Sequence, residues 1–267
     1  MPIAQVANNE LSYERSGSGE PLLLIMGMSG TARHWGEEFL GALRADFEVI
    51  VFDHRGVGDS TPLHGAITIA EMASDASGLL TALGIESAHV VGVSMGGMIA
   101  QELALAHPQQ VRTLTLGCTY CGGEGSSLAD PADLQELAEP MMSGDRARAL
   151  EAAWSINVSA ATAADAALKG RFMEVARVNA VAVPVVMAQM QACMAHDTNA
   201  RLGALEMPTL VIHGTVDRLL PVQNGRLIAS LIDGSRLEIF DDVGHMFWWE
   251  RAEQAAELVS AHAGVTV

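Results

Sequence analysis

Short, continuous apolar runs alternate with longer amphipathic segments along most of the chain. Six runs rich in β-branched residues have the length of strands, at residues 21–26, 47–53, 88–93, 111–117, 208–214 and 235–241. These runs lack a regular alternation of apolar and polar positions, which indicates strands covered on both faces. Helix-like segments separate them, at residues 35–45, 69–83, 95–107, 222–231 and 250–262.

The repeated order of strand, helix and strand predicts an α/β fold with a mostly parallel, doubly wound sheet. Two shorter segments near the N-terminus, at residues 3–6 and 11–15, predict antiparallel edge strands. The expected sheet therefore has eight strands. Pro108 ends the helical segment 95–107, because proline cannot continue a helix.

One long interval interrupts this order. Between residues 122 and 198 there is no strand pattern, only helical sequence rich in Ala, Met and Glu. We expect a helical cap there, inserted after the sixth strand, and a core built from residues 1–121 and 199–267. The cap carries six of the 14 methionines, Met141, Met142, Met173, Met187, Met190 and Met194. They either fill space between helices or form an adaptable apolar pocket wall.

Composition and charge narrow the class of partner. Of the 267 residues, 49% are hydrophobic and 18% are charged, which is typical of a globular protein. No apolar run reaches about 18 residues, so no transmembrane helix is expected. The N-terminus lacks the basic and apolar segments of a secretory signal, which favours a cytoplasmic location. The net charge of −17 disfavours nucleic acid and anionic membranes as partners, since both bind clusters of Lys and Arg. A small molecule is the expected partner.

The three cysteines, Cys118, Cys121 and Cys193, do not form a disulfide framework, because their number is odd. Cys118 and Cys121 make a C-x-x-C, which occurs in redox pairs and in zinc sites. A redox pair needs a helix N-terminus at the cysteines, and zinc needs two further ligands at a suitable spacing. Neither is visible, so a structural role is expected and no metal is predicted. The glycine pattern of a dinucleotide site is missing as well, so no cofactor is predicted.

The stretch "VVGVSMGG" places Ser94 between Gly92 and Gly96, where a predicted strand meets a predicted helix. A serine on such a turn has a strained backbone and an exposed hydroxyl, and its neighbours two positions away must be small. The turn also brings the Met95 amide to the start of the helix, where unpaired N–H groups favour an oxyanion. Ser94 is therefore a candidate nucleophile.

A serine hydroxyl needs a base, and the base needs an orienting carboxylate. On this architecture they follow the serine in the order Asp or Glu, then His. Asp217 lies just after the strand 208–214, and His245 lies just after the strand 235–241. Both therefore lie at the same edge of the sheet as Ser94, where open α/β sheets have their sites. The three residues are predicted to form a catalytic triad.

These motifs resemble those of the α/β-hydrolase-fold serine hydrolases, and the resemblance covers essentially the whole chain. It rests further on "LLLIMGMSGTARHW" (22–35), "FDHRGVGDS" (52–60), "PTLVIHGTVDRLLP" (208–221) and "GHMFWWE" (244–250). Within that superfamily, "GVSMGGMIAQELALAHP" and "HDTNARL" are most similar to small esterases, enol-lactonases and cofactor-free haloperoxidases. The resemblance implies an α/β-hydrolase fold, with Ser94 as nucleophile, His245 as general base and acid, and Asp217 as its orienting partner.

The resemblance also implies an oxyanion hole made by the backbone amides of Met28 and Met95. Met26 stands where the family often has a histidine, so a polar side chain that helps to brace the oxyanion loop is missing. The loop 52–60 is implied to be scaffold at the rim of the active site, with Asp53 and His54 outside the chemistry.

Large apolar residues cluster near the predicted base. Trp248 and Trp249 follow His245 closely and either seal the cap against the core or line a substrate pocket. In the second case Trp35, Met246 and Trp248 are the expected pocket residues. Apolar walls would exclude water and strengthen the oxyanion interactions.

We expect a serine-dependent hydrolase of small, apolar carboxylic esters that forms an acyl-enzyme. A lactonase or enol-lactonase would use the same residues, and a carboxylate-bearing lactone would need a cation, for which the cap offers Arg146, Arg148, Lys169, Arg171 and Arg177. A carbon–carbon bond hydrolase on the same triad is less favoured, because those sequences usually carry Asn before the serine and this chain has Val93. From a different class, a non-catalytic small-molecule binding protein on this fold is the alternative.

Overall fold

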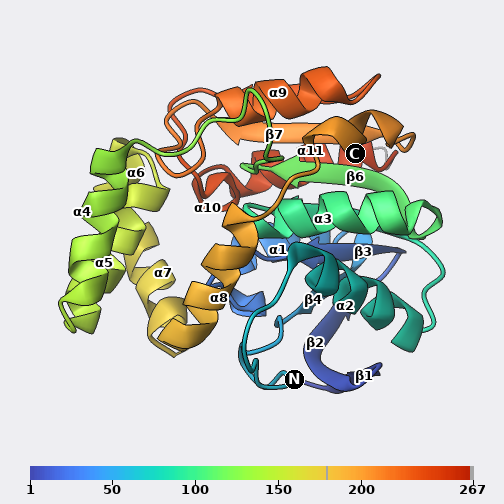
Figure 1. Cartoon of the computed structure of the whole chain (residues 1–267), viewed down its shortest axis with the longest axis horizontal. Helices are drawn as coiled ribbons and strands as arrows, with labels where there is room; N and C mark the ends of the chain where they lie inside the picture. The colour runs from blue at the N-terminus through green and yellow to red at the C-terminus, as the bar shows by residue number, and fades with distance from the viewer. Residues whose placement is uncertain (179, 265–267) are drawn as a thin grey trace.

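An eight-stranded sheet forms the centre of the protein in a computed structural model (Figure 1). The structure describes residues 1–178 and 180–264, except for the side chains of Leu137 and Met141. The strands are β1 (Ile3–Val6), β2 (Asn9–Gly17), β3 (Glu20–Ile25), β4 (Phe47–Phe52), β5 (Ala88–Val93), β6 (Val111–Gly117), β7 (Thr209–Gly214) and β8 (Arg236–Phe240). Their order across the sheet is β1-β2-β4-β3-β5-β6-β7-β8. β1 and β2 pair in antiparallel orientation, and the other six strands are parallel. The predicted fold class is confirmed.

Helices cover both faces of the sheet, as Figure 1 shows. One face packs against α2 (Ile69–Ala82), α3 (Met95–Ala106) and α9 (Gln223–Leu231). The other packs against α1 (Glu37–Leu43), α10 (Phe247–Glu250) and α11 (Ala252–His262). These packing surfaces form two apolar clusters, one on each side of the sheet.

Side chains of the central strand β5 alternate between the two clusters, because successive residues of a strand point to opposite faces. Val90 belongs to the first cluster, and Val91 and Val93 belong to the second. All six residues of β5 are buried. The residue that follows β5, Ser94, is therefore held by well-packed structure on both sides.

Between β6 and β7 the chain forms a group of helices beyond one end of the sheet (Figure 1). They are α4 (Pro131–Met142), α5 (Arg146–Asn157), α6 (Ala160–Ala163), α7 (Ala166–Val178) and α8 (Val183–Met194). A short 3₁₀ helix, η3 (Asn199–Ala204), leads back to β7. The expected helical insertion after the sixth strand is thus confirmed, while the division into core and cap at residues 122 and 198 stays a prediction.

The cap methionines do not behave as one group. Met173 is buried in the second apolar cluster, whereas Met142, Met187, Met190 and Met194 are exposed. The side chain of Met141 lies outside the described part of the structure. Filling of the interior therefore accounts for Met173 but for none of the four exposed side chains.

Within the described residues, no single helix is both long and apolar enough to cross a membrane; α7 and α8 reach that length and composition only as a pair, across a bend of 108°.

Candidate active site

Ser94 lies on a sharp turn between β5 and α3. Its backbone has φ 55° and ψ −124°, in the left-handed region that side-chain-bearing residues rarely adopt. The turn requires two glycines: a side chain at Gly92 would overlap the Gly96 carbonyl, and one at Gly96 would overlap the Ile25 carbonyl. Met95 is the first residue of α3, a position where the backbone N–H has no acceptor within the helix.

Asp217 and His245 lie on the loops after β7 and β8, at the carboxyl edge of the sheet that also holds Ser94. His245 Nδ1 and Asp217 Oδ2 are 2.7 Å apart, and both side chains are buried. Because a carboxylate only accepts hydrogen bonds, Nδ1 carries a proton, and in the neutral ring the lone pair therefore lies on Nε2. The three side chains predicted from sequence thus lie at the carboxyl edge of the sheet, and two of them, Asp217 and His245, are hydrogen-bonded to each other.

The Asp217 carboxylate is fully occupied by donors. Oδ1 accepts the backbone N–H groups of Leu219 and Leu220, each at 2.9 Å. Oδ2 accepts His245 and also lies 3.3 Å from Nε2 of His213, a completely buried side chain of β7. His213 Nε2 donates to the Leu220 carbonyl at 2.7 Å, which fixes its proton on that nitrogen. Two histidines therefore flank one carboxylate.

These contacts set the charges of the pair. Burial by itself would raise the pKa of Asp217, but the neighbouring His245 and His213 lower it well below its ordinary value. Burial would likewise lower the pKa of His245, but the Asp217 charge outweighs it and raises that pKa well above its ordinary value. The carboxylate thus stays ionised and makes the imidazole a stronger base.

Cys118 directly follows β6 and lies beside the His245 ring and the Ser94 backbone. Burial raises the pKa of its thiol, so the thiol stays protonated. Among the described residues, Cys118, Asp217 and His245 form the one group whose potential metal-ligating atoms lie within 4.8 Å of one another. Asp217 and His245 already bind each other, and a metal would need the deprotonated thiol. The expectation that the site holds no metal stays a prediction.

The segment after β3, residues 26–30, lies against Ser94. A Cβ added at Gly27 would come within 3.0 Å of Ser94 Cβ and 3.6 Å of its Oγ. Met28, the predicted oxyanion donor, follows Gly27 directly and is partly buried. We call residues 26–30 the oxyanion loop.

Three side chains brace the oxyanion loop without the histidine that the family often has at position 26. His54 Nε2 donates to the Met26 carbonyl at 2.9 Å, and burial lowers the pKa of His54 to about 4, so it remains neutral. Asp53 Oδ1 accepts the Ala32 N–H at 2.7 Å, just beyond the loop. Gln189 Oε1, from cap helix α8, accepts the Ser29 N–H at 2.9 Å. The loop 52–60 therefore acts as scaffold, and the loss of a histidine at Met26 is offset by backbone contacts.

Glu250 links the His245 loop to the cap. Its carboxylate accepts the Gly244 N–H at 2.7 Å, next to His245, and the Thr162 hydroxyl of the cap at 2.7 Å. It also accepts the Ser159 hydroxyl at 2.5 Å and the Ser159 N–H at 3.1 Å. One carboxylate thus ties the loop that holds His245 to α6 and to its N-cap residue Ser159.

The aromatic residues predicted to line a pocket lie in the second apolar cluster. Trp35 is fully buried and contacts Phe39 and Trp248, with ring centroids 5.6 Å away in both cases. Trp248 and Met246 are also buried, and the Met246 N–H donates to the Asn157 carbonyl of α5 at 2.8 Å. The rings thus pack against each other within the core, and Met246 contacts the cap. A role for Trp35, Met246 and Trp248 in substrate binding stays a prediction.

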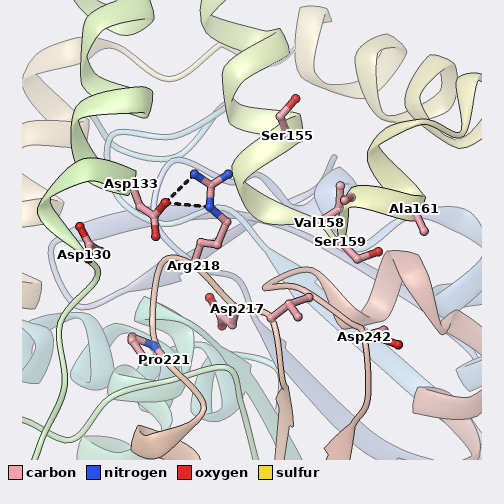
Figure 2. A pocket seen from close by; sticks show the side chains of 12 residues that line it. Asp130, Asp133, Ser155, Val158, Ser159, Ala161, Asp217, Arg218, Pro221 and Asp242 are labelled. Atoms are coloured by element: carbon pink, nitrogen blue, oxygen red, sulfur yellow. Dashed lines mark hydrogen bonds and ion pairs between the residues drawn. The ribbon is translucent and has the colours of Figure 1, made fainter.

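A cleft of about 610 Å³ opens between the cap and the loop after β7 (Figure 2). Its lining combines cap and core residues, namely Asp130, Asp133, Ser155, Val158, Ser159, Ala160, Ala161, Val216, Asp217, Arg218, Pro221 and Asp242. Figure 2 shows Arg218 turned toward Asp133, to which its Nε donates at 2.8 Å. Four aspartates against one paired arginine make this cleft unfavourable for an anion.

The cap cations that could hold a carboxylate are engaged elsewhere or lie outside the cleft lining. Arg146 donates to the Ala176 and Arg177 carbonyls at the end of α7. Three others form ion pairs on the surface, Arg148 with Glu139, Lys169 with Glu151 and Arg171 with Glu38. No residue of the set appears in the described lining of the cleft.

A family model for the alpha/beta hydrolase fold matches residues 20–152 and 190–252. The chain belongs to this family. It is 31% identical over 258 residues to the "Putative carbamate hydrolase RutD" of Azorhizobium caulinodans, which covers 92% of either chain. It is 33% identical over 266 residues to a 2-hydroxymuconate semialdehyde hydrolase of Pseudomonas putida, covering 91% of this chain and 86% of that one.

Among solved structures, a hydrolase from Pseudomonas aeruginosa PA01 superposes with a TM-score of 0.84 at 28% identity, over 98% of both chains. The resemblance seen in the sequence is therefore confirmed, and membership of the alpha/beta hydrolase fold family supports a hydrolase that acts on small molecules. The relatives' names imply different bonds, so the comparisons support hydrolysis but neither a particular bond nor a particular substrate.

Three residues at this alpha/beta hydrolase site were not assigned to it from sequence. The sequence predicts a structural role for Cys118, and it gives no signal that places His213 or Gln189 at the site. The position of Cys118 directly after β6, the strand next to β5, is a signal that could have found it. Gln189 is the one polar residue among the described buried residues of α8. Sequence could single it out only if the buried face of this helix were already known.

Proposed function

We propose that this alpha/beta hydrolase cleaves small, uncharged carboxylic esters through an acyl-enzyme on Ser94. In this proposal His245 is the general base and acid, and Asp217 orients it. The backbone N–H groups of Met28 and Met95 bind the oxyanion. The observation that carries the proposal is the 2.7 Å hydrogen bond between His245 Nδ1 and Asp217 Oδ2, because it leaves Nε2 free to take a proton.

The reaction proceeds in two steps. His245 Nε2 accepts the Ser94 proton as Oγ attacks the ester carbonyl, and the resulting oxyanion is held by the two amides. His245 then gives the proton to the leaving alcohol as the carbon–oxygen bond breaks. A water molecule, deprotonated by His245, attacks the acyl-enzyme, and the proton returns to Ser94 as the acid leaves. The Asp217 carboxylate stabilises the imidazolium formed in both steps.

The preference for uncharged substrates rests on the charges around the site. The cleft beside Asp217 is lined by four aspartates and by none of the candidate cap cations, although Ser94 and His245 do not line it themselves. A carboxylate on the substrate would therefore meet repulsion without a compensating cation. This disfavours the enol-lactones that carry such a group, while neutral lactones fit the same residues.

The Ser94→Ala variant tests the proposal. Because the attacking oxygen is removed, we expect kcat/KM for 4-nitrophenyl butanoate to fall by at least about 10⁴-fold with unchanged thermal unfolding. Ser155→Ala, an exposed serine of the cleft, is the matched control and should retain full activity. A fluorophosphonate probe should label the wild type at Ser94 once per chain. Hydrolysis retained in Ser94→Ala would contradict the role of Ser94 as nucleophile. A wild-type protein that neither hydrolyses the ester nor reacts with the probe would favour the non-catalytic binding protein.

Carbon–carbon bond hydrolysis is the second candidate, favoured by the similarity to the Pseudomonas putida protein. It would use the same three residues, and Val93 before the serine departs from the usual asparagine. Assays of a vinylogous 1,5-diketone beside the ester decide between the two reactions, since the preferred substrate has the higher kcat/KM.

A further inference from the structure

Gln189 is a polar residue on the buried face of cap helix α8, where its neighbours are Val185, Val186, Ala188 and Ala192. Its side chain is completely buried. Oε1 accepts the Ser29 N–H at 2.9 Å. The amide is therefore oriented: turning it over would place its NH₂ group against another donor. Its NH₂ group therefore points away from the Ser29 N–H.

The Nε2 atom of Gln189 is buried and has no hydrogen-bond partner among the described residues. Buried amide groups in folded proteins are nearly always paired, because an unpaired donor costs free energy. A buried donor that is held unpaired against the oxyanion loop points to an acceptor supplied by the ligand.

The position of this donor specifies which part of a substrate it would meet. Ser29 lies in the oxyanion loop, directly after Met28, and Gly27 of the same loop contacts Ser94. The leaving alcohol has to lie toward His245, which protonates it and which belongs to the loop after β8. The acyl part remains bonded to Ser94, against which the oxyanion loop packs.

We propose that Gln189 Nε2 donates a hydrogen bond to a second oxygen in the acyl part of the substrate. The substrate class is then esters of oxo- or alkoxy-acids, whose neutral carbonyl or ether oxygen accepts from an amide. A neutral donor suits a neutral acceptor, in agreement with the acidic cleft. The inference rests on the proposed ester hydrolysis and adds a specificity residue to it.

The test compares two esters of equal shape, ethyl 3-oxobutanoate and ethyl 3-methylbutanoate, in which an oxygen replaces a methyl group. Hydrolysis is followed by titration of the released acid for the wild type and for Gln189→Met, which keeps the chain length but has no donor. Differences in the intrinsic reactivity of the two esters cancel when kcat/KM of each variant for an ester is divided by the wild-type kcat/KM for that ester. Gln191→Met, an exposed residue of the same helix, is the control.

We expect Gln189→Met to lower kcat/KM for ethyl 3-oxobutanoate about tenfold more than for ethyl 3-methylbutanoate. Gln191→Met should leave kcat/KM for both esters unchanged. An equal fall for both esters would mean that Gln189 only braces the oxyanion loop and would overturn the proposal. Unchanged values for both would overturn it as well. If Gln189→Met does not fold, Gln189→Asn, which withdraws the donor by one methylene, allows the same comparison.

The two proposals fail in different ways. If the wild-type protein hydrolyses ethyl 3-methylbutanoate through Ser94, and Gln189→Met changes kcat/KM for both esters to the same extent, only the role of Gln189 is contradicted. A wild-type protein that hydrolyses neither ester contradicts ester hydrolysis, and the role of Gln189 fails with it.

Discussion

Two of the attachments between the cap and the carboxyl edge of the sheet are built differently. On the side of α5 and α6, Glu250 and Met246 bind the cap through several hydrogen bonds around His245. On the side of α8, the described contact to the oxyanion loop is a single hydrogen bond from Ser29 to Gln189, whose other end is unpaired.

The difference separates two tasks. The histidine has to keep one orientation throughout the reaction, and a closed set of hydrogen bonds enforces that. The oxyanion loop is already braced from the core by His54 and Asp53, so the cap can present a donor to the substrate there. We therefore expect changes on the His245 side to affect all substrates alike, and changes on the α8 side to affect selected ones.

The largest effect on the His245 side is expected from Asp217→Asn. An amide at this position can turn its NH₂ toward the ring and impose the wrong tautomer, so kcat/KM for 4-nitrophenyl butanoate should fall by about 10³–10⁴-fold. Activity requires neutral His245, and its pKa is raised, so wild-type kcat/KM should fall as the pH drops through a value above about 6.5. Without the Asp217 charge that pKa decreases, and the acid limb of the pH profile should move to lower pH. A limb that stays in place would contradict the pairing.

A smaller effect is expected from Glu250→Ala, which removes the link between Gly244 and the cap. The displaced loop should lower kcat about tenfold to hundredfold for both ethyl esters alike. Loss of hydrogen bonds to a charged group should lower the free energy of unfolding by about 2–3 kcal/mol. Denaturant titration and kcat measurements check both, with Glu253→Ala, an exposed residue nearby, as the control. A fall in kcat confined to ethyl 3-oxobutanoate would contradict the expectation that changes on the His245 side affect all substrates alike.

The smallest effect on the His245 side is expected from His213→Phe, which keeps a ring in β7 but removes the N–H beside Asp217. The carboxylate then interacts more strongly with His245, whose pKa rises further. The acid limb of kcat/KM should therefore move to higher pH, with kcat lowered about tenfold. His89→Phe, a buried histidine near the opposite end of the sheet, serves as the control for loss of a buried imidazole. A change in stability without a shift of the limb would show that His213 is only structural.

The strands and the three residues Ser94, Asp217 and His245 could be predicted from sequence because each follows from a local pattern. A continuous apolar run gives a strand, and its end gives the catalytic edge. Helix boundaries were less accurate: the segment 35–45 is broken at Gly36, whose φ of 74° does not fit a helix. The segment 250–262 likewise divides into α10 and α11 at Arg251.

The bracing of the oxyanion loop could not be predicted, because its contacts join distant parts of the chain. Gln189 is 160 positions from Ser29, and His54 is 28 positions from Met26. No spacing rule connects such pairs; their contact depends on how α8 and the loop after β4 pack. The substrate class depends on the same packing, which explains why the sequence yields a candidate nucleophile but no substrate.

The close approach of Gly244 to the cap has a consequence for engineering. A Cβ at this position would come within 2.8 Å of the Val158 backbone, so the histidine loop and the end of α5 fit each other without spare room. A chimera that exchanges the cap of this protein for that of a relative therefore has to exchange residues 244–250 together with it. With the cap helices alone exchanged, the loop that carries His245 would lose the surface against which it fits.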